Sequence, residues 1–149
     1  MRFPGSDFLD RHREDATLFI RLIVGFHLVY GTQDNVFSWE RMLEFERFLA
    51  ERSVPYPLAA AIISVYAQFF SGLLFIVGAA VRWAGAVMII NFIAALIIAH
   101  RGLPYPANFP PLMMLAAACF FLFHGAGGLS LDAALARRRQ AASPTGASR

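Results

Sequence analysis

Between Leu58 and Ala99 the chain runs for 42 residues with a single formal charge, at Arg82, and no other feature constrains the fold as strongly. A helix needs roughly 20 mostly apolar residues to cross the hydrocarbon core of a bilayer, so this run is long enough for two spans. Lipid offers the backbone no hydrogen-bond partner, so each span is expected to be an α-helix. Arg82 then marks the tight turn between them. The sequence therefore predicts an integral membrane protein.

The composition agrees with a membrane location. Hydrophobic residues make up 58% of the 149 residues, above the roughly 45–50% of ordinary soluble domains. The net charge of +3 is too small to indicate a nucleic-acid partner. Cys119 is the only cysteine, which excludes intramolecular disulfides and cysteine metal clusters. A chain of this length is expected to form one domain.

Two further apolar stretches bring the expected number of spans to four. The first follows an N-terminal segment in which acidic residues accompany the arginines, so we interpret it as a retained span and not as a signal peptide. The last begins with Pro110-Pro111, which suit a first helical turn, and ends at the glycines of residues 125–128. The expected spans are about 16–35, 57–81, 83–101 and 109–126. The predicted fold class is all-α, an integral membrane four-helix bundle.

The distribution of arginines predicts the orientation of this bundle. Four spans place both termini on one side of the membrane, and positive charge favours the cytoplasm. The side of the termini holds most of the arginines, whereas the opposite side holds those at positions 41, 47, 52 and 101. Both termini are therefore expected in the cytoplasm. Residues 1–132 form the expected membrane domain, and residues 133–149, rich in Ala, Arg and Ser, are expected to form a disordered cytoplasmic tail.

The connection between the first two spans is predicted to be an amphipathic helix lying in the membrane interface. Within Phe37–Arg52, apolar residues fall on one side at helical spacing, and charged residues repeat on another side at Glu40, Glu44, Arg47 and Glu51. Two interpretations stay open. The helix either closes a cavity that opens to the outer leaflet or only seals the top of the bundle.

Polar side chains at membrane depth are the candidate functional residues, because they are costly in lipid and usually face the bundle interior. Five are expected to contact a ligand: Arg21, His27, Gln68, Asn91 and His124. Four of them also have a structural interpretation. Arg21 can extend its guanidinium to the interface, and His27 can hydrogen-bond to a neighbouring helix. Gln68 and Asn91 lie on stripes of small and polar residues, which membrane helices use to pack closely against each other.

No metal site is expected from the histidines. His100 ends the third span on the outer side, whereas His124 ends the fourth span on the inner side. A hydrocarbon core of about 30 Å separates the two, so they cannot share a metal ion. His27 and His100 lack the close spacing of metal or haem ligands. The polar residues instead form two expected layers, with Arg21 and His124 on the cytoplasmic side and His27 and His100 on the outer side.

Several short motifs, taken in their order and spacing, resemble the DoxX family of small four-helix membrane proteins. The resemblance covers roughly residues 18–132. Its motifs are Arg21-Leu-Ile-Val-Gly25 followed by Gly31, Ser53-Val-Pro55-Tyr-Pro57, Ser71-Gly72-Leu-Leu-Phe-Ile-Val-Gly78, Val81-Arg82-Trp-Ala-Gly85, Asn108, and Gly125-Ala-Gly-Gly-Leu-Ser-Leu-Asp132. One position departs from the family pattern. Gln68 stands where members often have an acidic residue, and an amide cannot act as a carboxylate base near neutral pH.

The resemblance implies a protein of the bacterial cytoplasmic membrane that is linked to redox chemistry. It implies an accessory or quinone-interacting subunit of a membrane oxidoreductase system or redox-stress complex, with redox partner proteins and a homo-oligomer as further expectations. The sequence has no flavin, haem or iron–sulfur motif, so electrons would come from a partner protein. The alternative is a non-catalytic membrane scaffold that recruits soluble redox proteins. A small-molecule or proton carrier is a third interpretation, which the scarcity of buried carboxylates disfavours.

Overall fold

The computed structural model describes residues 6–142, and helices are the only regular secondary structure over that range. Its helices are α1 (Ser6–His12), α2 (Thr17–Phe37), α3 (Trp39–Ala50), α4 (Pro57–Val77), α5 (Val81–Ile98), α6 (Tyr105–His124) and α7 (Leu131–Ala142). The predicted all-α class is therefore confirmed for the described residues.

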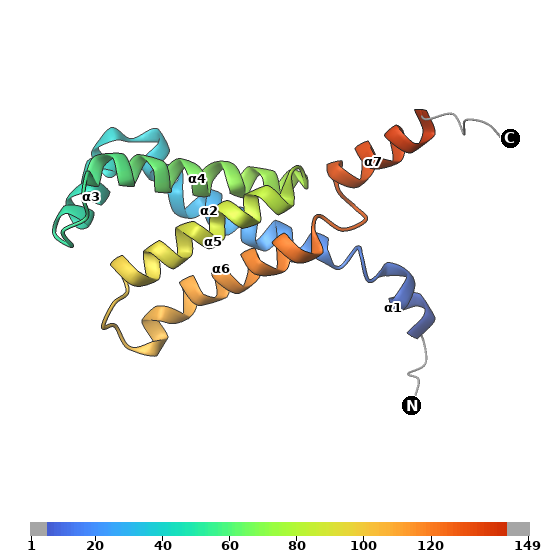
Figure 1. The fold of residues 1–149 in the computed structure, drawn as a ribbon, viewed down its shortest axis with the longest axis horizontal. Coiled ribbons are helices and arrows are strands. Elements are labelled where there is room, and N and C mark those ends of the chain that lie inside the picture. Colours follow the sequence, from blue (N-terminus) through green and yellow to red (C-terminus); the bar gives the residue numbers. More distant parts are fainter. Residues whose placement is uncertain (1–5, 143–149) are drawn as a thin grey trace, which may run out of the picture.

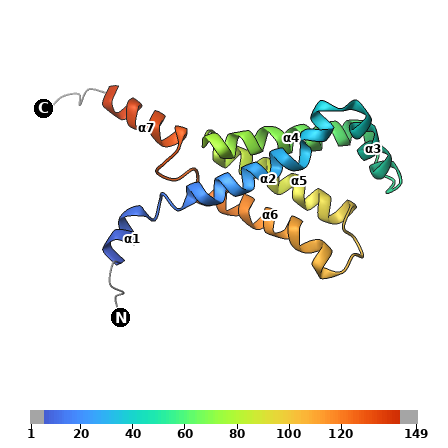
Figure 2. The same cartoon turned by 180° about the vertical axis from the view of Figure 1, so that it is seen from behind.

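Four long helices, α2, α4, α5 and α6, run side by side and give the molecule an elongated shape (Figure 1). Contacts join α2 to α4, α4 to α5 and α5 to α6, with weaker contact between α2 and α6. At one end of the molecule, here the α3 end, α3 packs on α4 and α2. At the other end, here the terminal end, α1 and α7 lead away from the long helices, as Figure 2 shows from behind. The two ends of the described chain thus lie at the same end of the molecule.

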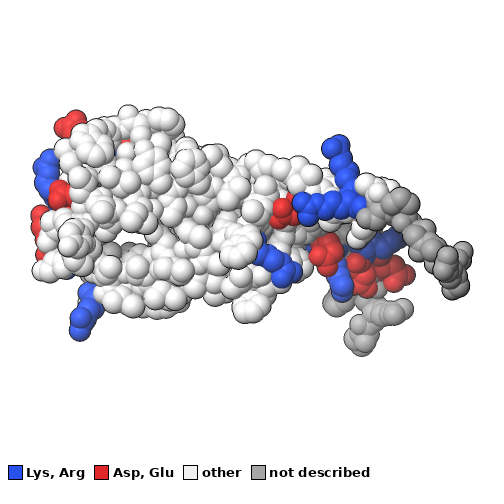
Figure 3. Space-filling model, turned by 45° about the horizontal axis from the view of Figure 1, so that its top comes forward, with Lys and Arg blue, Asp and Glu red and all other residues white. Residues whose placement is uncertain are grey.

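Three of the long helices, α4, α5 and α6, are long and apolar enough to cross a membrane, and no other helix within residues 6–142 meets both requirements. The 21 residues of α2 extend over about 31 Å at 1.5 Å per residue, but Arg21, His27 and Asp34 make it less apolar. Figure 3 shows the charged side chains gathered at the two ends of the visible face, with a broad uncharged stretch between them. The protein is thus a multi-pass membrane protein.

The turn between α4 and α5 lies earlier than the sequence analysis places it. α4 ends before Gly78, whose φ of 74° is in the left-handed region that glycine adopts without strain. Ala80, with φ of 49°, precedes α5. Arg82 is therefore the second residue of α5 and not the turn residue. The predicted spans 57–81 and 83–101 correspond to Pro57–Val77 and Val81–Ile98, and the predicted span 16–35 to Thr17–Phe37.

α6 begins before the predicted span 109–126. The sequence analysis places Pro110-Pro111 in the first helical turn, whereas the helix runs from Tyr105 to His124 with Pro106 in its first turn. Pro110 and Pro111 therefore lie inside the helix, where they cannot donate to the carbonyl groups four residues earlier. Two backbone carbonyls near the start of α6 consequently lack their usual helical donor.

The C-terminal segment is helical where the sequence analysis expects a disordered tail from residue 133. α7 extends to Ala142, and residues 143–149 lie outside the described residues. Ser130 starts this helix, because its Oγ accepts a hydrogen bond from the backbone N–H of Ala133 at 3.1 Å. Ala, Leu and Arg, which are strong helix formers, fill most of α7. Local helix propensity and the cap thus outweigh the polar composition that indicated disorder.

The predicted amphipathic helix between the first two spans is present as α3. Ser38 separates α2 from α3 and caps α3, since its side chain accepts a hydrogen bond from the backbone N–H of Arg41 at 3.4 Å. Met42 and Leu49, on the apolar face of α3, are buried against the beginning of α4. α3 is therefore packed onto the long helices through its apolar face.

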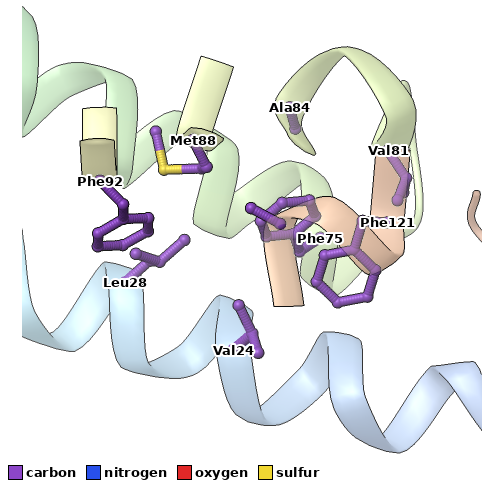
Figure 4. Packing of buried hydrophobic residues seen from close by; sticks show 9 residues of the cluster. Val24, Leu28, Phe75, Val81, Ala84, Met88, Phe92 and Phe121 are labelled. Atoms are coloured by element: carbon purple, nitrogen blue, oxygen red, sulfur yellow. The ribbon is translucent and has the colours of Figure 1, made fainter. Parts of the chain in front are cut away.

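The main hydrophobic core lies toward the terminal end and joins all four long helices (Figure 4). Its buried side chains are Val24, Leu28, Phe75, Val81, Ala84, Met88, Phe92, Ala118 and Phe121. Phe75 of α4 packs against Phe121 of α6, with ring centroids 4.5 Å apart. Glycines let the backbones approach here: a Cβ added to Gly85 of α5 would lie 2.9 Å from the carbonyl oxygen of Ala118 in α6.

Candidate functional site

A cavity of about 660 Å³ lies toward the α3 end, a volume within the roughly 300–1,000 Å³ of small-molecule sites. Figure 3 shows the molecule hollowed toward that end. Five helices contribute to its mostly apolar lining, which includes His27 of α2, Phe45 and Phe48 of α3, Ser64 and Gln68 of α4, Asn91 of α5, and Pro110, Pro111 and Met114 of α6. α3 thus forms one wall of a cavity in addition to covering α4.

A hydrogen-bonded polar group lies on the wall shared by α4 and α5. The Ser64 hydroxyl donates to Asn91 Oδ1 at 2.9 Å, which joins the two helices. The Gln68 amide donates from Nε2 to Ser64 Oγ at 3.2 Å and lies 3.3 Å from the Ser64 carbonyl oxygen one helical turn away. These bonds have the geometry of polar helix packing in membranes, and the same side chains line the cavity.

Two histidines line the cavity, His27 of α2 and His100 just after α5. His27 is an exposed residue of α2 that contributes to the lining, so it is available to a molecule in the cavity. His100 follows the end of α5, and its Nδ1 is buried without a hydrogen-bond partner. The sequence analysis places His100 with His27 in the outer layer but omits it from the ligand-binding set, because it considers His100 as a metal ligand only. Its position at the end of a span was the signal that could have identified it.

Arg21 lies away from this cavity, at the terminal end. Its side chain is 1% exposed, so the guanidinium is enclosed by protein. Its Nη2 donates to the carbonyl oxygen of Leu129 at 2.7 Å, in the segment between α6 and α7. A Cβ at Gly78 would collide with the guanidinium, so glycine at the α4–α5 turn makes room for it. Arg21 therefore joins α2, the α4–α5 turn and the C-terminal segment.

His124 also lies at the terminal end. Its Nε2 is 3.3 Å from Oε2 of Glu14, and its ring stacks on Phe120 with centroids 4.9 Å apart. With Arg82 and Asp132 it lines a smaller hollow of about 390 Å³. The structure thus brings His27, Gln68 and Asn91 to one cavity and places Arg21 and His124 elsewhere.

The cavity lining fits a quinone. Most of the surface is apolar, and Phe45 and Phe48 supply aromatic side chains for a ring and an isoprenoid tail. Asn91 Nδ2 of α5, which makes no hydrogen bond within the described residues, is available as a donor to one of its oxygens, and His27 of α2 is a further polar group of the lining. The sequence analysis found these polar residues from their depth in the spans. It left open whether the helix now seen as α3 closes a cavity, and the structure places Phe45 and Phe48 of α3 in the lining. It did not find the wall from α6, whose apolar residues have no pattern that separates a cavity lining from a core.

The fold and the cavity define an all-helical, multi-pass membrane protein. Residues 16–101, more than half of the chain, match the model of the DoxX family, and the chain therefore belongs to the DoxX family. This confirms the resemblance drawn from the motifs. The match covers α2 to α5 and ends before residues 125–132, whose motif also contributed to the resemblance. No curated protein and no solved structure matches the chain.

Proposed function

We propose that this protein binds a membrane quinone in the cavity near the α3 end and acts as an accessory subunit of a membrane oxidoreductase system. The observation that carries the proposal is the polar group of Ser64, Gln68 and Asn91 on the wall of an otherwise apolar cavity. A quinone needs an apolar slot for its ring and tail and polar groups for its two oxygens. His27 adds a polar side chain from a third helix. The redox setting rests on the family resemblance.

We also propose that α2 crosses the membrane together with α4, α5 and α6, which gives a four-helix bundle in the bacterial cytoplasmic membrane with both termini in the cytoplasm. α2 packs along α4, and its Arg21 is turned inward onto protein, which removes that charge from lipid. The arginine distribution favours the terminal end as the cytoplasmic end. The cavity then lies in the outer half of the membrane, and α3 lies in the outer interface.

Reporter fusions test this topology. Green fluorescent protein fused after Ala142 is expected to fluoresce, because it folds in the cytoplasm, and alkaline phosphatase at the same place is expected to be inactive. Alkaline phosphatase inserted after Arg52, in the connection between α3 and α4, is expected to be active. The reverse pattern of the two reporters would contradict the proposed orientation.

Quinone binding is tested on the purified protein in lipid nanodiscs. We expect wild-type protein to bind an added short-chain benzoquinone, and Asn91→Leu to weaken binding about tenfold by removing one hydrogen-bond donor. Gln33→Leu removes a polar group from α2 at a position that does not line the cavity, so it is expected to bind normally. Equilibrium dialysis measures the affinities, and thermal unfolding checks the fold of each variant. Absence of quinone from an organic extract, together with no affinity for added quinone, would refute the proposal.

The second candidate function is a scaffold that recruits soluble redox proteins. It is favoured by α1 and α7, which carry charged residues and lead away from the long helices (Figure 1). A scaffold predicts that substitutions on the exposed face of α7 abolish function while Gln68 and His27 tolerate change. The quinone proposal predicts the opposite result, so a complementation assay with both sets of variants separates the two functions.

A further inference from the structure

Ser64, Gln68 and Asn91 form the polar wall of the cavity, and some of their hydrogen-bonding atoms are already paired with one another whereas others are not. Ser64 has one hydroxyl proton, and it donates this proton to Asn91 Oδ1 at 2.9 Å. The same hydroxyl oxygen accepts from Gln68 Nε2 at 3.2 Å. Asn91 therefore presents its oxygen to Ser64, and Gln68 presents its nitrogen.

Two atoms of this wall remain without a partner. Gln68 Oε1 and Asn91 Nδ2 make no hydrogen bond to any group within residues 6–142. Neither atom is buried, since the buried side-chain atoms without a partner in that range belong to Arg21, His100 and His124. Both atoms are therefore still reachable, and their residues line the cavity. Gln68 Oε1 accepts hydrogen bonds only, whereas Asn91 Nδ2 donates only.

We infer that the cavity prefers the reduced, dihydroxy form of its ligand, a quinol, over the oxidised quinone; this inference rests on the proposed function. The oxygens of a quinone ring only accept, so a bound quinone satisfies Asn91 Nδ2 and leaves Gln68 Oε1 without water and without a partner. A quinol hydroxyl both donates and accepts. A quinol therefore satisfies the two amides together.

The same wall holds a quinol without removing its proton. Oxidation of a quinol releases two protons and two electrons, and the amide of Gln68 takes up neither near neutral pH. His27 and His100 are the titratable residues of the lining within the described part of the chain, and neither is hydrogen-bonded to Gln68 or Asn91 there. The amide wall is thus suited to hold the reduced carrier for a partner protein.

The test compares the affinities of a short-chain benzoquinone and of its chemically reduced quinol for the full-length protein in nanodiscs. Both are measured under anaerobic conditions, so that the quinol stays reduced. One additional neutral hydrogen bond changes affinity by roughly three- to tenfold, so wild-type protein is expected to bind the quinol more tightly by that factor. Gln68→Met removes the acceptor at similar size and is expected to abolish the preference. Gln33→Met makes the same change outside the cavity lining and is expected to leave it unaltered.

The outcomes separate this inference from the proposed function. Equal affinity of wild-type protein for the two forms, or tighter binding of the quinone, overturns the quinol preference and leaves quinone binding in place. A preference that survives in Gln68→Met also overturns it. Binding of neither form by wild-type protein refutes the proposed function itself. The wild-type comparison needs no variant, so it decides the preference even if Gln68→Met does not fold.

Discussion

Gly72→Leu is expected to destabilise the protein by about 3 kcal/mol or more, because α2 and α4 meet backbone to backbone at this residue. A Cβ on Gly72 would lie 2.8 Å from the carbonyl oxygen of Gly25 and 2.9 Å from Cγ2 of Val29. The reverse contact is equally close, since a Cβ on Gly25 would lie 2.7 Å from the carbonyl oxygen of Gly72. Backbone atoms of a helix cannot move aside individually. A leucine at position 72 therefore has to push the two helices apart.

Gly31→Leu is the matched control for this prediction. Gly31 lies on the same helix as Gly25, but a Cβ added there meets nothing within 4 Å. The leucine at position 31 is therefore expected to change stability by less than about 0.5 kcal/mol. Unfolding by denaturing detergent, followed by circular dichroism, measures both variants. If the two leucine variants lose the same stability, the tight contact between α2 and α4 is not what stabilises the helix pair.

The helices were predictable where the sequence carries a strong local signal. The predicted second span begins at residue 57, and α4 begins at Pro57. The predicted helix boundaries were wrong where groups far away in the sequence determine them. α5 begins before Arg82 because the carboxylate of Asp132, 51 residues from Val81, accepts from the N–H groups at its start. No local pattern around Arg82 contains this information.

The candidate site was predictable in its residue types and only partly in its grouping. The stripes of small and polar residues placed Gln68 and Asn91 at helix–helix contacts, and the structure joins the two side chains through Ser64. Depth along a helix does not determine which neighbour a side chain meets. Arg21 was expected to contact a ligand. In the structure its Nη2 donates to the Leu129 carbonyl, 108 residues further along the chain, and within the described residues its Nε and Nη1 are buried without a hydrogen-bond partner. Such a contact follows from the packing of the whole molecule.

Asp132→Ala is expected to lower the stability by about 2–4 kcal/mol, because it removes two charge-assisted hydrogen bonds from the start of α5. The Asp132 carboxylate accepts from the backbone N–H of Ala80 at 2.9 Å and from that of Val81 at 3.2 Å. Its own N–H donates to the Gly78 carbonyl oxygen at 3.0 Å. Its negative charge also attracts the buried guanidinium of Arg21. One side chain thus joins the start of α7, the start of α5 and α2.

Asp10→Ala provides the control, since Asp10 is an exposed acidic residue of α1 and its removal is expected to cost less than about 0.5 kcal/mol.

Combining Asp132→Ala with Arg21→Met separates the cap from the charge interaction. If the two side chains interact, the double variant is expected to lose less stability than the sum of the single losses, by about 0.5–3 kcal/mol. Detergent-induced unfolding measures the wild-type protein, the three single variants and the double variant, and limited proteolysis of α7 reports whether the C-terminal segment has detached. Additive losses would show that Asp132 acts on α5 alone and that Arg21 is held by the Leu129 carbonyl without it.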